Sequence, residues 1–173
     1  MKVVDVIAHI LKREGIEYLS AFPTTPLIDA VTRVGIRPII CRQERVGVGI
    51  ADGYSRVQNG NLPGVFAMQS GPGAENAYAG VATAYSDGVP ILLLPLGQPR
   101  EMDGVFPNFS SVRSYGSVTK LIEQINTPNR VVETMRRAFS SLKMGRPGPV
   151  MVEIPSDVAM ENLDDSLLDD YKP

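Results

Sequence analysis

The sequence has only one cysteine, one histidine and no long apolar run, and each shortage excludes a class of protein. Cys41 alone cannot form an intramolecular disulfide or a CxxC zinc pair. The most apolar stretch, residues 89–95, is far too short to span a bilayer. We therefore expect no structural disulfide, no zinc centre and no membrane partner, and a reducing, cytoplasmic location.

An excess of charge of one sign is also absent. The chain of 173 residues carries 17 Lys and Arg against 19 Asp and Glu, and these charges are scattered. Basic patches bind nucleic acids and anionic lipids, and this sequence has none. The first residues do not combine a basic segment with a long apolar one, so a secretory signal is not expected. The expected partners are small molecules and protein surfaces.

Short apolar runs alternate with helical patterns along most of the chain. We predict strands at residues 18–22, 37–41, 64–68, 90–95 and 149–154, with a short one near Val118. Between them we predict helices from the first residues to about Gly15 and at residues 27–34, 43–58, 74–86 and 130–142. Continuous apolar strands separated by helices indicate a parallel sheet covered on both faces. The fold class is therefore α/β, a three-layer α/β/α sandwich with an open, mainly parallel sheet of about six strands.

Two segments interrupt this alternation. Residues 97–116 form a long irregular connection rich in Gly, Pro and Ser, which is typical of a functional or mobile loop. After Ile154 the composition becomes polar and acidic. We interpret residues 159–173 as a linker toward a further domain, leaving a domain of residues 1–158. Acidic runs in linkers are normally solvated, so we assign no metal site.

Polar segments follow four of the predicted strands, at the edge where parallel sheets bind ligands. They are residues 22–26, 42–45, 69–76 and 96–99. Each has a structural interpretation too. Thr24 or Thr25 can cap the next helix, Glu44 can interact with a helix dipole, and Gln98 can bond to loop backbone. The glycines of residues 71–73 can serve a tight turn, and they fit neither GxGxxG nor GxxxxGK[ST].

Two reactive side chains have ordinary interpretations. His9 lies on the first helix, away from the strand ends, so we interpret it as structural or solvent-facing. Cys41 follows a strand beside Arg42, but no histidine is near in sequence, and a buried thiol is the better interpretation.

In order and spacing, the four segments resemble the N-terminal domain of thiamine-diphosphate enzymes of the acetolactate synthase, pyruvate oxidase and benzoylformate decarboxylase superfamily. The resemblance covers residues 1 to about 158 and rests on Arg42-Gln43-Glu44 with residues 51–56, on residues 70–74 and on residues 145–150. Thr24-Thr25 stands where acetolactate synthases usually carry two glycines. Phe106-Pro107-Asn108 replaces a Phe-Gln-Glu run. These departures leave the substrate open.

The resemblance implies roles for seven residues. Glu44 resembles the catalytic glutamate that hydrogen-bonds N1′ of the aminopyrimidine of thiamine diphosphate, and so helps the cofactor's amino group to take the proton from C2. The cofactor then serves as electron sink when a 2-keto acid such as pyruvate loses carbon dioxide. The pyrimidine pocket would be lined by Pro23, Gly73 and Asn76 besides Glu44. The residues that would face the reacting carbonyl are Thr25, Gln69 and Gln98.

The resemblance further implies that a separate domain with a Gly-Asp-Gly motif holds the diphosphate and its Mg²⁺. No such triplet occurs in this chain. We therefore expect an incomplete active site that needs a diphosphate-binding domain of the full enzyme or of a partner chain. An exposed apolar face and a homodimer or higher oligomer are expected with it. Some relatives also use FAD, for which this sequence gives no sign.

Two other classes of function stay open at this point. The chain could be a non-catalytic oligomerisation module that keeps the fold with a vestigial pocket, although the presence of Glu44 argues against this. It could also be a flavodoxin-like or nucleotide-binding protein, which the fold alone permits. The absence of both phosphate-binding patterns argues against that class.

Overall fold

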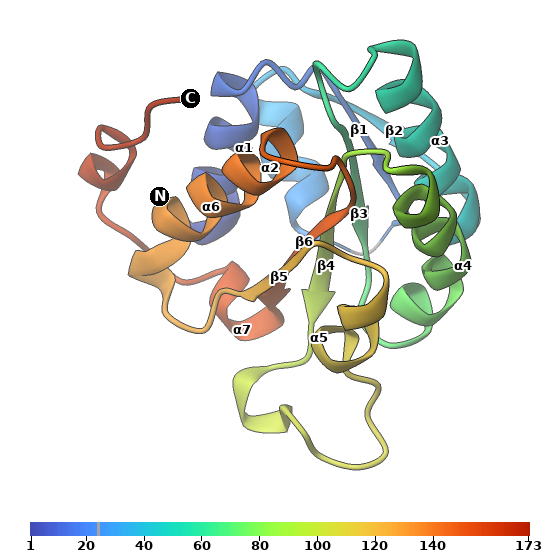
Figure 1. Cartoon of the computed structure of the whole chain (residues 1–173). Helices are drawn as coiled ribbons and strands as arrows, with labels where there is room; N and C mark the ends of the chain where they lie inside the picture. The colour runs from blue at the N-terminus through green and yellow to red at the C-terminus, as the bar shows by residue number, and fades with distance from the viewer. Residues whose placement is uncertain (24) are drawn as a thin grey trace.

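A parallel sheet of six strands forms the centre of the protein (Figure 1). The computed structural model describes residues 1–23 and 25–173. The strands are β1 (Tyr18–Ala21), β2 (Arg37–Ile40), β3 (Gly64–Met68), β4 (Ile91–Gly97), β5 (Leu121–Gln124) and β6 (Val150–Pro155). They are ordered β2-β1-β3-β4-β6-β5, and every neighbouring pair is parallel. All six carboxyl ends therefore lie at one edge of the sheet.

Helices cover both faces of this sheet (Figure 1). One face carries α1 (Val3–Arg13), α2 (Leu27–Arg33) and α6 (Val131–Lys143), and the other carries α3 (Glu44–Val57) and α4 (Pro72–Asp87). The short helices α5 (Ser111–Ser114) and α7 (Ser156–Ala159) lie near the carboxyl ends of the strands. The predicted three-layer α/β/α sandwich is thereby confirmed.

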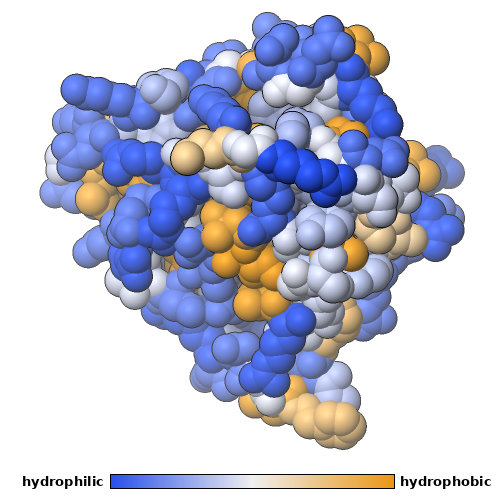
Figure 2. Space-filling view, viewed as in Figure 1, coloured by the Kyte–Doolittle hydropathy of each residue, from blue (hydrophilic) through white to orange (hydrophobic). Residues whose placement is uncertain are grey.

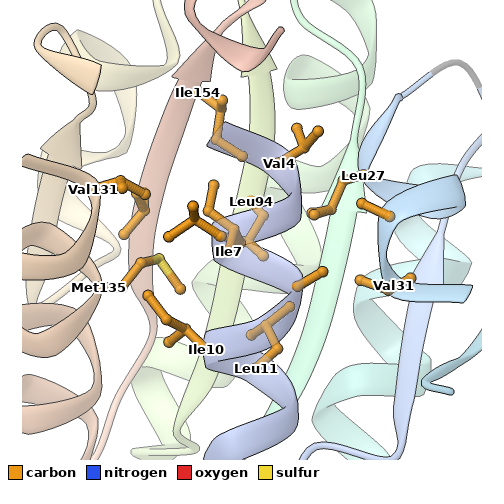
Figure 3. Packing of buried hydrophobic residues seen from close by; sticks show 14 of the residues in the cluster. Val4, Ile7, Ile10, Leu11, Leu27, Val31, Leu94, Val131, Met135 and Ile154 are labelled. Atoms are coloured by element: carbon orange, nitrogen blue, oxygen red, sulfur yellow. The ribbon is translucent and has the colours of Figure 1, made fainter. Parts of the chain in front are cut away.

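Alternating side chains of the central strands fill two separate apolar cores. On β4, Leu92 and Leu94 belong to the core beneath α1, α2 and α6, whereas Ile91 and Leu93 belong to the core beneath α3 and α4. Figure 3 shows the first core, with the apolar stripe of α1 above Leu94. Because successive side chains of a strand point to opposite faces, a strand buried on both sides must be apolar throughout. This is the physical reason for the continuous apolar runs in the sequence.

Small residues let α3 approach the sheet and α4 closely. A Cβ at Gly64 would lie 2.0 Å from the carbonyl oxygen of Ala51, and one at Gly47 would collide with the ring of Phe66. A Cβ at Gly80 would lie 2.9 Å from a methyl group of Val48. Larger residues at these positions would push α3 away from its neighbours. The close packing therefore fixes the position of α3 against the sheet and α4.

Three details of the predicted elements were wrong. The strand expected near Val118 is β5, three residues later, because Val118 closes a 3₁₀ turn at Tyr115–Ser117. The helix expected from Ala74 begins at Pro72, since proline is well suited to the first position of a helix. The irregular connection after β4 is not wholly without structure, because it contains a 3₁₀ turn at Arg100–Met102 and α5.

The acidic segment after α7 packs against the helical layer of α1 and α6. Leu163, Leu168 and Tyr171 are buried, while the acidic side chains between them face outward. The side chain of Arg13 on α1 donates hydrogen bonds to the carbonyl oxygens of Leu168 and Tyr171. Tyr171 also donates its hydroxyl proton to Glu14. The position at which the domain gives way to a linker stays a prediction.

Within the part of the chain that the structure describes, no helix combines the length and the apolar character needed to cross a bilayer.

Candidate functional site

Glu44 is the first residue of α3 and is almost completely buried, with 5% of its surface exposed. Gln43 precedes it in an extended conformation, so α3 begins directly after the chain leaves β2. A carboxylate in the first turn of a helix is favoured by the helix dipole. Glu44 is thus a carboxyl group withdrawn from water, directly after the carboxyl end of β2.

Asn76 and Gly73, both in the first turns of α4, surround this carboxyl group. The side-chain amide of Asn76 donates a hydrogen bond of 2.7 Å to Glu44 Oε2. The other oxygen, Oε1, would lie 3.2 Å from a Cβ at residue 73. Glycine at this position therefore avoids crowding the carboxyl group.

The turn between β3 and α4 brings Gln69 to the same place. A Cβ at Gly73 would lie 2.7 Å from Cγ of Gln69, so these two residues are in close contact. Gly71, which caps α4, has φ +61°, a conformation that side chains rarely adopt. The glycine-rich turn therefore serves local geometry and also places Gln69, Gly73 and Asn76 around Glu44.

Pro23 and Thr25 lie at the end of β1, in a separate open hollow. Pro26, Ile28 and Ile40 line the same hollow. Thr25 is buried, and its hydroxyl oxygen accepts a hydrogen bond of 3.3 Å from the backbone N–H of Leu27, at the start of α2. The capping interpretation therefore describes what Thr25 does in this structure. Thr24, the other candidate cap, lies outside the described residues.

Gln98 follows β4 and lines a recess beside the start of α4. The wall of this recess also includes Ser70 and Gly71 from the β3–α4 turn, and Glu153 from β6. The structure therefore divides the seven predicted site residues among three places at one edge of the sheet. Glu44, Gln69, Gly73 and Asn76 are brought together, Pro23 and Thr25 share the hollow, and Gln98 lies in the recess.

Glu153 is a site residue that sequence reasoning missed. It is an acidic residue on the central strand β6, and only 6% of its surface is exposed. Gln124 on β5 donates a hydrogen bond of 2.6 Å to its Oε1, and the hydroxyl of Ser111 donates to its Oε2. A lone glutamate within the otherwise apolar run of residues 149–154 was the signal that could have found it.

The two side chains set aside as ordinary are where the sequence predicted. Cys41 is buried, its thiol donates to the carbonyl oxygen of Ala21 at 3.3 Å, and burial raises the pKa of the thiol. Its interpretation as a buried thiol is confirmed. His9 is exposed on α1, in agreement with its interpretation as structural or solvent-facing.

Comparison with known proteins identifies a family for this chain. Residues 1–124 match the family described as thiamine pyrophosphate enzyme, N-terminal TPP binding domain. The chain belongs to this family. The resemblance that the sequence motifs carried is therefore confirmed, and the matched residues include Glu44, Gly73, Asn76 and Gln98.

Curated relatives of this thiamine pyrophosphate enzyme domain are large enzymes. The chain is 33% identical over 169 residues to a probable acetolactate synthase large subunit of Methanocaldococcus jannaschii, covering 95% of this chain and 28% of the relative. It is 35% identical over 163 residues to a chloroplastic acetolactate synthase of Nicotiana tabacum, covering 91% and 24%. The large subunit of Haemophilus influenzae is 32% identical, with 91% and 28% covered. The chain thus spans about a quarter of the length of these relatives.

The residues of this family member fit the pyrimidine end of thiamine diphosphate. A ring nitrogen that exchanges a proton needs a carboxyl group shielded from water, and Glu44 is such a group. Glycine at position 73 lets the start of α4 lie close to Glu44 and Gln69, because a Cβ there would be 3.2 Å from Oε1 and 2.7 Å from Cγ of Gln69. The described residues contain no group of three or more His, Cys, Asp and Glu side chains arranged to hold a metal ion. The individual roles of the seven residues stay predictions.

Proposed function

We propose that this chain binds the aminopyrimidine of thiamine diphosphate within an acetolactate synthase-like enzyme that decarboxylates or joins 2-keto acids such as pyruvate. One observation carries the proposal. The buried carboxyl group of Glu44 is hydrogen-bonded by Asn76 on one oxygen, and its other oxygen lies against Gly73. A group that shares a proton with a ring nitrogen needs this combination of burial and fixed orientation.

Each residue of the site has its own part in the proposal. Glu44 holds or releases a proton at the ring nitrogen N1′, and Asn76 fixes the orientation of the carboxyl group. Gly73 lets α4 approach Glu44 without crowding it. When bound, thiamine diphosphate supplies an acidic carbon at C2 and an electron sink for decarboxylation. Gln69, Gln98 and Thr25 are proposed to face the 2-keto acid, and Pro23 to line the pyrimidine pocket.

The chain is proposed to be inactive without a second domain. The diphosphate and Mg²⁺ need ligands of their own, and no Gly-Asp-Gly triplet occurs in this sequence. We propose that a diphosphate-binding domain, from the complete enzyme or from a partner chain, supplies them. The length of the curated relatives supports this, because about three quarters of each lies outside the region that the chain matches. FAD stays unassigned, and we propose the cytoplasm as the location.

Exposed apolar side chains support association with such a domain or with a second copy. Ile40 on β2 and Val46 and Val57 on α3 are all more than half exposed. Figure 2 shows further apolar side chains in the middle of one face and at the tip of the loop that follows β4. Surfaces of this kind are often covered in complexes, so we propose a dimer or higher oligomer.

Calorimetric titration tests the proposal directly. The purified chain is titrated with thiamine diphosphate and Mg²⁺, alone and after addition of the diphosphate-binding domain. We expect weak binding by the chain alone and tight binding once the second domain is present. Tight binding by the chain alone would show that it carries its own phosphate site and would contradict the proposal of a shared site.

A non-catalytic interaction module is the alternative, and Glu44 distinguishes the two. In the complete enzyme, Glu44→Gln should remove most activity and leave assembly intact. If the chain is only an oligomerisation module, the same variant will leave both activity and assembly unchanged.

A further inference from the structure

Glu153 is a buried acid for which the proposed chemistry provides no role. Burying a carboxyl group is costly unless it is hydrogen-bonded, and two side chains donate hydrogen bonds to Glu153. Gln124 holds Oε1 from the neighbouring strand, and Ser111 holds Oε2 from α5. An apolar residue would fill the same volume without this cost. The buried acid therefore points to a function at the carboxyl end of β6.

The contacts of Glu153 lie at both ends of the β4–α5 loop, residues 98–110. Gly97 ends β4 directly before the loop, and a Cβ at that position would lie 2.8 Å from Glu153 Oε1. Ser111, directly after the loop, donates to Oε2. Within the loop, the negative charge of Asp103 acts on the same carboxyl group. Glu153 is thus in contact with both ends of the loop and in electrostatic contact with its middle.

The β4–α5 loop forms much of the recess that contains Gln98. Met102, Asp103, Asn108 and Phe109 line the recess together with Ser70 and Gly71. Figure 1 shows the loop projecting beyond the carboxyl ends of the strands. Its tip is exposed, with Phe106 93% accessible, whereas Arg100 near its start is paired with Asp157 and Glu161, so the loop is held near its ends. A change at either end therefore alters the shape of the recess.

We propose that Glu153 is a positioning residue that holds the β4–α5 loop against the sheet while it is uncharged and releases the loop when it ionises. The inference rests on the proposed function in one respect. The shape of the recess affects the reaction only if Gln98 faces the 2-keto acid, as proposed. The positioning itself depends only on the contacts of this chain.

Electrostatics gives the direction of this change. Burial raises the pKa of Glu153 above its ordinary value of 4.5, and the charge of Asp103 raises it further, while the hydrogen bonds from Ser111 and Gln124 oppose the shift. The closed loop therefore binds the proton more tightly than an open loop, in which the carboxyl group meets water. The stabilisation is complete below pH 4.5 and is lost as the pH rises through the raised pKa. Raising the pH should open the loop.

Hydrogen exchange of the whole chain measures this opening. Peptides that cover residues 98–117 are followed over a series of pH values, and the rates are corrected for the pH dependence of exchange itself. For each unit by which the closed loop raises the pKa, the ratio of open to closed loop should rise about tenfold. Peptides from α1 and β4 serve as internal references, and we expect their protection to change far less.

Two variants separate the carboxyl group from other causes. In Glu153→Gln, the amide oxygen can accept from Gln124 and the amide N–H can donate to Ser111, so the side chain copies the uncharged acid. We expect loop protection that no longer depends on pH. Asp103→Asn removes the repelling charge from the loop and should reduce the pH dependence without abolishing it. This second variant keeps the test valid if the first folds poorly.

Glu123→Gln is the matched control. Glu123 lies on β5, is partly buried, and pairs with Arg137 instead of contacting the loop. It should leave the pH dependence of the loop unchanged. The inference is wrong if the corrected exchange of the wild-type loop is independent of pH, or if Glu153→Gln keeps the wild-type pH dependence.

Activity of the complete enzyme that carries this chain supplies the functional readout. In the wild type, KM for the 2-keto acid should rise with pH as the loop opens, and Glu153→Gln should remove this rise. A purely structural role would lower the amount of folded enzyme and leave the pH profile of KM unchanged. The two proposals fail separately: normal turnover of Glu44→Gln defeats the proposed function, whereas pH-independent loop exchange defeats the role of Glu153 alone.

Discussion

Asn76 donates a hydrogen bond of 2.7 Å to Glu44 although the two residues are 32 positions apart in sequence. The contact joins the first turns of α3 and α4, which lie side by side on one face of the sheet. Both helices begin at the carboxyl ends of their preceding strands, so their first turns meet at one edge. This relationship makes Glu44 a buried and oriented carboxyl group, and the first two predictions follow from it.

Replacing Glu44 by Gln should lower kcat/KM of the complete enzyme by at least about 100-fold, because an amide cannot exchange a proton with a ring nitrogen. The fold should persist, since the amide oxygen can still accept from Asn76. Steady-state kinetics and circular dichroism of the same preparation measure both effects. Glu75→Gln, an exposed acid in the first turn of α4, is the matched control and should retain nearly full activity.

Removing the Asn76 side chain should destabilise the domain. In Asn76→Ala the carboxyl group of Glu44 stays buried and loses the hydrogen bond from Asn76, which costs about 1–3 kcal/mol of unfolding free energy. Urea unfolding followed by circular dichroism measures the loss. Asn61→Ala is the control. Asn61 lies in an exposed turn, and its side chain forms no hydrogen bond with the described residues, so this variant should change stability by less than about 0.5 kcal/mol. Equal losses in the two variants would contradict the role of Asn76.

Adding a methyl group at residue 73 should damage the site. Gly73→Ala places a Cβ 2.7 Å from Gln69 Cγ and 3.2 Å from Glu44 Oε1, so both side chains must shift. Thiamine diphosphate affinity of the complete enzyme, measured by calorimetry, should fall by at least about tenfold because the carboxyl group of Glu44 is displaced.

Gly53→Ala, on the neighbouring helix α3, is the control for Gly73→Ala and should not damage the site. A Cβ at Gly53 on α3 meets no atom within 4 Å. Alanine is the better helix former, so this variant should stabilise the domain by about 0.5–1 kcal/mol and leave cofactor binding unchanged. A loss of affinity in Gly53→Ala would show that the site responds to α3 as a whole, and not to the space at residue 73.

A chain shortened to residues 1–158 tests where the domain ends. If a linker begins at residue 159, the shortened chain should be as stable as the whole chain. Because Leu163, Leu168 and Tyr171 are buried, we expect instead a loss of several kcal/mol, at about 1.5–3 kcal/mol for each buried apolar side chain. Differential scanning calorimetry compares the two chains. Tyr171→Phe removes only the hydrogen bond to Glu14 and should cost about 1 kcal/mol.

The sequence by itself determined the layers and the position of the main site. Strands buried on both faces must be apolar throughout, and this constraint allowed residues 64–68 and 149–154 to be predicted as strands without a structure. Parallel strands direct the residues that follow them to one edge, which is why the segments 42–45 and 69–76 were expected to lie there. The family resemblance then implied Glu44, Gly73 and Asn76 within these segments, and the structure brings the three together.

Only the tertiary structure decided which neighbours the remaining polar residues have. Glu153 lies between Gln124 and Ser111, and no local pattern links these three positions. The burial of Tyr171 likewise depends on α1 and α6, far away in sequence, while the acidic residues around it look like those of a solvated linker. Local pattern reports which face of an element is apolar. The energy of a buried polar group depends on partners from distant parts of the chain, so the fold alone reveals it.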